Sequence, residues 1–223
     1  MNNLFSIFDP SSSFMNLSFN WTSSMFIIMF IPLSLWMIPN RSLILLTKIL
    51  NILNNEIQTL LKNNSFKGIS IMMISLFMMI LLNNFMGLLP YIFTSSSHLV
   101  FNLSFSLPIW LTLMFFGWLN KTESMFSHLI PLGTPPLLMP FMVLIESISN
   151  IIRPLTLAVR LTANMIAGHL LISLLSNNGN SISIYFYWLI ILTEIILMTL
   201  ESSVAIIQSY VFTILSTLYT SEI

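Results

Sequence analysis

Charge is what this sequence has least of. Only 14 of its 223 residues are charged, which is 6%, against about 25% in an ordinary soluble domain. Hydrophobic residues make up 56%, and the mean hydropathy is +0.92. So few charges could not cover the surface of a soluble globule, which excludes a soluble enzyme, a disordered chain and a nucleic-acid-binding protein. The continuous apolar runs favour an all-α, polytopic membrane protein over a β-barrel.

Cysteine is absent altogether, and glycine is scarce. Without cysteine the chain has no disulfide framework, no thiolate metal site and no cysteine nucleophile. Glycine occurs six times, and no stretch matches the phosphate-binding pattern GxxxxGK[ST]. We therefore expect no metal, no cofactor and no nucleotide bound by this chain itself.

Charge-free stretches place the first three membrane spans. The N-terminal stretch predicts a span at about 20–39, with Pro32 as a kink. Residues 68–120 are also uncharged, which leaves room for two spans, at about 69–90 and 106–120.

Residues 41–64 have a different pattern. Their apolar residues recur at helical spacing and leave a polar face that includes Lys48, Asn51 and Gln58, which predicts an amphipathic helix in the membrane interface. The alternative is a linker helix that packs on the other spans. The apolar positions are Leu46, Ile49, Leu50, Leu53, Ile57, Leu60 and Leu61.

Two long apolar tracts complete a single membrane domain over 1–223 with about five crossings. They lie at about 137–175 and 182–219 and are separated by SNNGNS. A 39-residue helix is about 58 Å long, whereas the hydrocarbon is about 30 Å thick. Each tract must therefore either break or tilt strongly, at roughly 60° to the membrane normal, where ordinary spans tilt by about 20°. We expect a strongly tilted helix hairpin.

The basic residues outside these tracts predict the orientation. With five spans, the segments after the first and third spans share one side and hold all five of these basic residues, while the loops on the other side hold none. The positive-inside rule therefore places the N-terminus outside and the C-terminus inside. The five residues are Arg41, Lys48, Lys62, Lys67 and Lys121.

Five charges fall inside the long tracts, where each would cost about 2.5–3.5 kcal/mol at a helix centre. Glu146, Arg153 and Arg160 are seven apart, and so are Glu194 and Glu201, with Gln208 one heptad further on. Seven residues fall only about 20° short of two turns, so each helix carries one polar stripe. These groups should face water, each other or a partner.

Some of these residues also have plain structural interpretations. Arg153, which precedes a proline, could extend to the interface or pair with Glu146, and Glu194 could be solvated near the outer interface. His169 lies about 180° from Arg160 around the helix and should face other helices of this chain. Arg160 is the hardest to explain structurally, because arginine cannot deprotonate to escape burial.

The sequences IESISNIIRPLTLAVRLTANMIAGHLL and LESSVAIIQSYVFTILSTLY resemble subunit a of F-type ATP synthases in the mitochondrially encoded form. They cover about residues 145–219, and NNFMGLLPY upstream agrees with the same family. The A/T-biased composition resembles insect versions. In that family, a tilted hairpin curves around a rotating ring of c subunits, each with a carboxylate at mid-membrane that two aqueous half-channels serve.

The resemblance implies a role for each candidate residue. Arg160 matches the invariant arginine, and Glu146 matches a polar residue of the matrix-side half-channel. His169 and Glu201 match the pair that lines the half-channel from the intermembrane space. Asn164 and Gln208 match polar positions close to the arginine.

Elementary chemistry fits these roles. A fixed cation favours an ionised carboxylate nearby, and Arg160, without a removable proton, cannot relay one between the half-channels. Imidazole at His169 can accept and release protons near neutral pH. Glu194 departs from the family pattern, and we hypothesise that it widens or hydrates the outer half-channel.

The expected function is therefore a proton-translocating stator subunit, not an enzyme on its own. Its partners would be the c-subunit ring, other Fo and peripheral-stalk subunits, lipid and protons, without nucleic acid and without direct ATP binding. It would lie in the mitochondrial inner membrane, with its N-terminus toward the intermembrane space and its C-terminus toward the matrix. The alternatives are an autonomous ion transporter, which a missing internal repeat argues against, and a structural subunit of a respiratory complex.

Overall fold

The computed structural model describes residues 4–12, 17–32, 38–61, 68–89, 91–130, 135–179 and 184–222. Within these ranges the ordered elements are all helical, which confirms the predicted all-α class.

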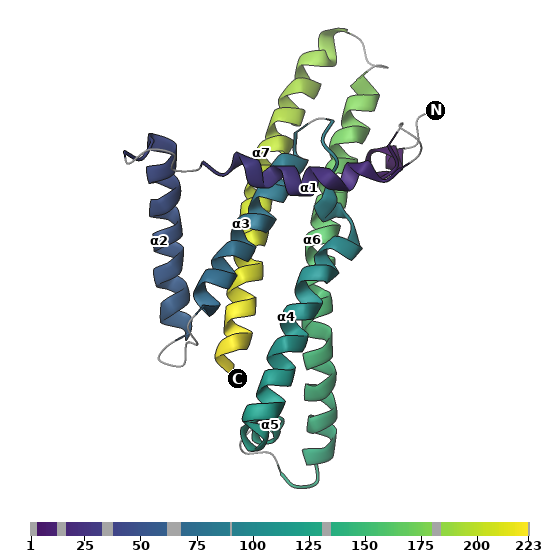
Figure 1. The fold of residues 1–223 in the computed structure, drawn as a ribbon. Helices are drawn as coiled ribbons and strands as arrows, with labels where there is room; N and C mark the ends of the chain where they lie inside the picture. The colour runs from purple at the N-terminus through teal and green to yellow at the C-terminus, as the bar shows by residue number, and fades with distance from the viewer. Residues whose placement is uncertain are drawn as a thin grey trace.

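Four helices are long and apolar enough to cross a membrane, among the residues described. They are α3 (Ile69–Gly87), α4 (Leu99–Asn120), α6 (Met139–Gly179) and α7 (Ile184–Glu222). Figure 1 shows them as a bundle in which the α6–α7 hairpin runs along α4 and α3. The chain is thus a multi-pass membrane protein.

The helix that ends at Asn120 begins seven residues earlier than the predicted start at residue 106. The prediction excluded the serine-rich sequence before it, but hydroxyls there need not interrupt a helix. The Ser104 Oγ donates to the Phe101 carbonyl at 2.7 Å, one turn back in the same helix. A short 3₁₀ turn, η5 (Ser95–Ser97), precedes α4, and α5 (Thr122–His128) follows it.

The predicted first span at 20–39 is not one continuous helix in the part of it that the structure describes. Residues 19–30 form three short pieces, η2 (Phe19–Thr22), α1 (Ser23–Phe26) and η3 (Ile27–Phe30). Ile31 is extended, with ψ 119°, because proline at the next position disfavours the helical conformation. In Figure 1 this segment lies across the bundle.

The amphipathic helix α2 (Arg41–Leu61) lies along the length of the bundle in Figure 1, antiparallel to α6, and packs on α3 and α7. Ile57 and Leu61 are buried against Met73 of α3, while Lys48 and Gln58 are exposed. These contacts match the alternative of a helix that packs on the spans. The positive-inside argument assumed that both ends of this segment lie on the same side of the membrane. Because α2 lies along the bundle and not across it, its two ends lie at different levels, so the predicted orientation stays a prediction.

Both long tracts form the uninterrupted helices that were expected. The helix α6 has 41 residues and α7 has 39, and Pro154 lies inside α6 without ending it. They share a core with α3, formed by Ile80, Leu157, Leu161 and Phe212. Their tilt to the bilayer stays a prediction, because the helices are placed only relative to one another.

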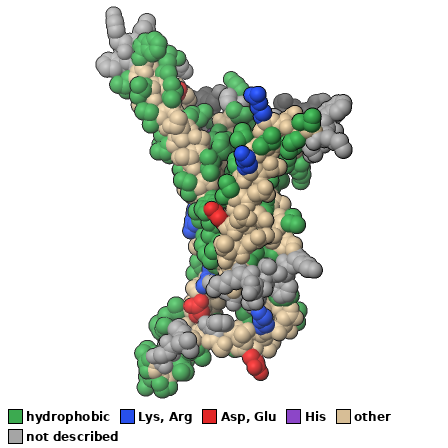
Figure 2. Space-filling model, turned by 90° about the vertical axis from the view of Figure 1, so that its left-hand side faces the viewer, with side chains coloured by type: hydrophobic (Ala, Val, Ile, Leu, Met, Phe, Trp, Pro, Cys, Tyr) green, Lys and Arg blue, Asp and Glu red, His purple; other side chains and the backbone are tan. Residues whose placement is uncertain are grey.

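The surface agrees with burial in lipid or against other subunits. Figure 2 shows one face covered mainly by hydrophobic and uncharged atoms, with a few isolated charged groups. Large apolar side chains are exposed along α6 and α7, among them Ile151 at 64% and Trp188 at 78%.

Candidate functional site

The helix α6 carries most of the candidate residues. It presents Glu146 and Arg153 in its first half, Arg160 in the middle and His169 in its second half. At 1.5 Å per residue, Arg160 lies about 21 Å along the axis from Glu146 and about 13 Å from His169.

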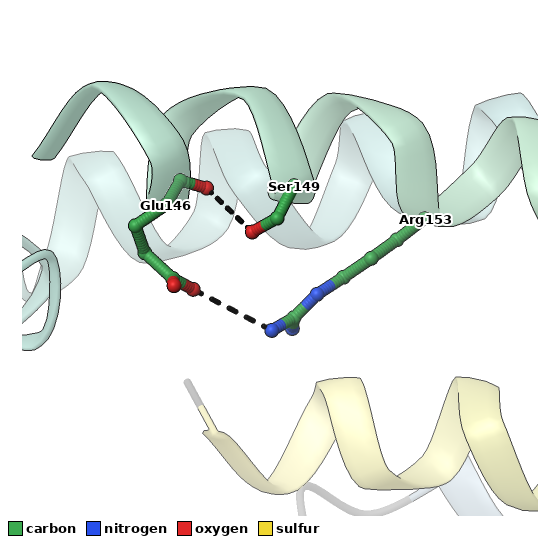
Figure 3. Close-up of polar contacts among 3 residues, drawn as sticks. All are labelled: Glu146, Ser149 and Arg153. Carbon is green, nitrogen blue, oxygen red and sulfur yellow. Dashed lines mark hydrogen bonds and ion pairs between the residues drawn. The ribbon is translucent and has the colours of Figure 1, made fainter. Parts of the chain in front are cut away.

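Glu146 and Arg153 pair with each other, as one of the structural interpretations expected. The Arg153 Nη2 lies 3.6 Å from the Glu146 Oε1, with both side chains about a third exposed. Figure 3 shows this pair on one side of α6, with the Ser149 hydroxyl donating to the Glu146 carbonyl at 2.8 Å. The Arg153 guanidinium also lies over the Tyr219 ring of α7, 5.0 Å from its centroid. An ion pair and a cation–π contact therefore satisfy Arg153 within this chain.

This pair lines a cavity of about 710 Å³ between α4, α5 and the two long helices. Trp110 and Trp118 of α4 form part of its apolar wall, and Ser147 and Asn150 add polar groups beside Glu146. We call it the inner cavity.

Arg160 has a different environment, although it shares a heptad position with Arg153. Its side chain is exposed, and no carboxylate lies within ion-pair distance in the described parts of the chain. Thr156, Ala163 and Ala167, which lie on the same face of the helix, are uncharged and also exposed. A permanent cation on an apolar, membrane-embedded surface requires an anionic or polar partner from outside the chain.

His169 faces other parts of this chain, as its spacing from Arg160 predicted. It is half-buried, its Nε2 has no hydrogen-bond partner among the described residues, and it lines a cavity of about 1120 Å³. The N-terminal segment, the end of α3 and the loop after α3 form most of the wall, and further residues of α6 and Met198 of α7 also line it. We call it the outer cavity, and it shares no lining residue with the inner cavity.

Glu201 of α7 packs directly on the backbone of α6 beside His169. A Cβ atom added at Gly168 would overlap with the Glu201 carboxylate, with Cδ only 2.6 Å away. Both carboxylate oxygens are buried and have no hydrogen-bond partner among the described residues. The structure thus brings the predicted pair, His169 of α6 and Glu201 of α7, to the same place, where Gly168 leaves room for the Glu201 carboxylate.

The remaining candidates, Asn164, Gln208 and Glu194, line neither of the two cavities. Asn164 and Gln208 are half-buried. Glu194 is also half-buried and lines a shallow hollow on α7 alone, formed with residues that include Ile191 and Met198. Among the residues described, no group of three or more His, Asp and Glu side chains could hold a metal ion.

A buried polar cluster next to Glu201 was not among the predicted site residues. The Ser95 hydroxyl donates to the Asn83 Oδ1 at 3.0 Å, and the Asn102 amide donates to the Ser96 carbonyl at 2.8 Å. The Asn84 amide reaches the Ala205 carbonyl at 3.5 Å, one helical turn from Glu201. The sequence signal was the asparagine pair in NNFMGLLPY together with the run of serines, both inside otherwise apolar stretches.

Comparison with known proteins relates these features to a family. The sequence matches the family described as ATP synthase A chain over residues 4–221. It is 57% identical to ATP synthase subunit a of Anopheles gambiae over 224 residues, which is 100% of this chain and 99% of the relative. Those of Locusta migratoria and Drosophila melanogaster are each 56% identical over 223 residues, with the same shares covered. The matched region contains both cavities and Arg160.

Proposed function

This chain belongs to the ATP synthase A chain family, and from that premise we propose that it is the proton-channel subunit in the stator of an F-type ATP synthase. It acts with the other subunits of the synthase and is not itself the catalytic subunit. The observation that carries the proposal is the exposed, unpaired Arg160 between two separate cavities, among the residues described. A proton path interrupted by a fixed cation needs a moving partner to carry protons past it.

The partner that fits Arg160 is a ring of c subunits, each with a carboxylate at mid-membrane. A guanidinium within a few ångströms stabilises the ionised carboxylate, so each carboxylate releases its proton on reaching Arg160. The small, uncharged side chains exposed on the same face, Thr156, Ala163 and Ala167, leave room for the ring to pass close to Arg160. Asn164, one helical turn after Arg160, and the half-buried Gln208 of α7 are proposed to hydrogen-bond the carboxylate as it arrives.

The outer cavity supplies the proton. We place the entry route along His169, then through the buried polar groups near Asn84 to Glu201. Imidazole and carboxylate are the two side chains best suited to pass protons near neutral pH. Their unpaired buried atoms support this assignment, because buried polar groups without protein partners are ordinarily hydrated.

The inner cavity receives the proton on the other side. Glu146 lies on its wall beside Arg153, and it is the carboxylate that we propose accepts the proton there. The tryptophan-rich wall matches the preference of Trp for the membrane–water interface.

The setting that fits is the mitochondrial inner membrane, with the outer cavity toward the intermembrane space. The C-terminus and Lys121 lie at the opposite end from the outer cavity, toward the matrix. Other Fo and peripheral-stalk subunits and lipid would cover the remaining apolar surface.

Glu194 keeps a proposed accessory role at the outer side. Met198 lines both the hollow beside Glu194 and the outer cavity, so this carboxylate lies near the entry route without being part of it. Proton-driven synthesis and its pH dependence should therefore change in Glu194→Gln, and an unchanged profile would refute the role.

The experiment that tests the proposal is Arg160→Ala in the assembled complex. We expect ATP-driven proton pumping to be lost, while the soluble sector still hydrolyses ATP. Purification should also recover a c-subunit ring and nucleotide-binding subunits with this chain. Normal ATP-driven acidification in the variant would overturn the assignment, and a lone chain that transports ions by itself would support an autonomous transporter instead.

A further inference from the structure

The outer cavity has a wall that the proposed proton path does not use. Residues of the N-terminal segment, including Ser6, Asp9 and Ser11, line part of it together with His169. The 3₁₀ helix η1 (Leu4–Phe8) packs on α6, and Figure 1 shows the N-terminal segment lying across the bundle at this level.

Phe8 holds this segment against His169. The two rings meet edge to face, with centroids 6.3 Å apart and planes at 84°, a favoured geometry for aromatic pairs. Asp9 is the next residue in the chain, and it lines the same cavity as His169.

Further hydrogen bonds fix the turn that carries Asp9. The Asn20 amide donates to the carbonyl oxygens of Asp9 and Ser11, at 3.3 and 3.4 Å. The Ser12 hydroxyl donates to the Leu17 carbonyl at 2.6 Å. The backbone of Asp9 is therefore held on both sides, while its side chain is exposed at the cavity.

The charges around the cavity have one sign. Among the described residues that line it, the ionisable groups are Asp9, Tyr91 and His169, and no Lys or Arg is present. The Asp9 carboxylate forms no ion pair within the described parts of the chain. A single-sign charge at the mouth of a low-dielectric cavity concentrates counter-ions and speeds their entry.

We propose that Asp9 is a proton-collecting residue, a fixed anion that concentrates protons at the mouth of the outer cavity for uptake by His169. The inference rests on the proposed function. Asp9 does not itself touch the c-ring carboxylate. It acts through His169, by raising the local concentration of protons near the imidazole. The rate of ATP synthesis should therefore depend on ionic strength, because exposed charges are screened over about 8 Å at physiological salt.

The test uses the complete complex in vesicles, with ATP synthesis driven by an imposed pH difference and potential. Asp9→Asn should slow synthesis about 10-fold at low salt, the lower end of the range for electrostatic focusing. Raising the salt on the Asp9 side should slow the wild type but scarcely affect the variant. Asp9→Glu should restore both the rate and the salt dependence.

Glu123→Gln is the matched control. It removes one exposed carboxylate at the start of α5, at the opposite end of the molecule, and should leave the rate and salt dependence unchanged. If Asp9→Asn keeps the wild-type rate and salt dependence, or if Glu123→Gln reproduces its effect, the proposal is wrong. A loss in Asp9→Asn that Asp9→Glu does not restore also contradicts it.

A second measurement separates charge from folding, because the chain contains no cysteine of its own. In assembled Asp9→Cys complexes, an anionic thiol reagent should raise synthesis and a cationic one should lower it further. Equal effects of the two reagents would overturn the proposal. Arg160→Ala, measured in parallel, tests the proposed function separately: if Arg160→Ala abolishes synthesis while Asp9→Asn has no effect, only the Asp9 inference fails.

Discussion

Two arginines one heptad apart on α6 show how strongly the environment decides what a residue does. Arg153 is held by Glu146 on its own helix and by Tyr219 of α7, whereas Arg160 is exposed on an apolar face. Their spacing predicted a common stripe, but the roughly 20° drift per heptad and the position of α7 give them different neighbours. Arg153 is thus satisfied within the chain and Arg160 is left for a partner.

The cation–π contact of Arg153 can be tested with a pair of variants at Tyr219. Tyr219→Leu should lower the free energy of unfolding of the purified complex by about 0.5–2 kcal/mol, because the ring is lost. Tyr219→Phe keeps the ring and should be close to wild type. Chemical denaturation in detergent measures both, and equal losses in the two variants would show that the ring face contributes nothing.

Gly168 should not tolerate a side chain. Gly168→Ala places a methyl group on the Glu201 carboxylate, so we expect overpacking of about 1–3 kcal/mol together with slower proton-driven synthesis. Glu201→Asp, which shortens the side chain, should partly restore stability in the double variant. Gly179→Ala is the control, since its nearest neighbour would be 4.0 Å away, and a loss there of equal size would contradict the explanation.

At the scale of elements, the sequence predicted the existence of the long helices better than their ends and directions. The length of the apolar stretches was enough to predict α3, α6 and α7. It failed at α4, which begins at Leu99, because intrahelical hydroxyl bonds let a serine-rich stretch stay helical. At Pro32 the sequence predicted a kink, and the helical turns end there at the extended Ile31. It did not predict that the turns before Pro32 are a mixture of 3₁₀ and α-helix.

The short turn η5 is tied to α3 by a buried hydrogen bond, and that bond should matter to stability. Asn83→Leu leaves the Ser95 hydroxyl without its acceptor, which should cost about 1–3 kcal/mol. Thermal or chemical unfolding of the purified complex would measure it. Ser75→Ala removes an exposed hydroxyl from the same helix and should change stability by less than about 0.5 kcal/mol. Equal effects would show that the buried bond is unimportant.

At the scale of the whole molecule, the arrangement is two cavities with Arg160 between them. Heptad spacing and the resemblance predicted the residues Glu146, Arg160, His169 and Glu201 on the two helices. They could not predict that Phe8 contacts His169 or that Glu201 packs on Gly168. Those contacts join parts of the chain that are distant in sequence, so they depend on how the helices pack and not on any local pattern.

The two cavities should be reachable from opposite sides of the membrane. Ser173 lines the outer cavity and Ser147 lines the inner one, so the variants Ser173→Cys and Ser147→Cys place one thiol in each cavity. A membrane-impermeant thiol reagent added to the intermembrane-space side should modify only the first, and from the matrix side only the second. Modification of both from one side would mean that the cavities belong to a single open pathway.

The measurement that tests the central claim most directly is passive proton flux through vesicles stripped of the soluble sector. If Arg160 is the barrier between the two routes, Arg160→Ala should abolish coupled pumping and raise the passive leak, because no fixed cation then separates the cavities. Arg153→Ala, which removes the neighbouring arginine on the same helix, should leave the leak at the wild-type level. An Arg160→Ala complex with normal coupling and a wild-type leak would contradict the account.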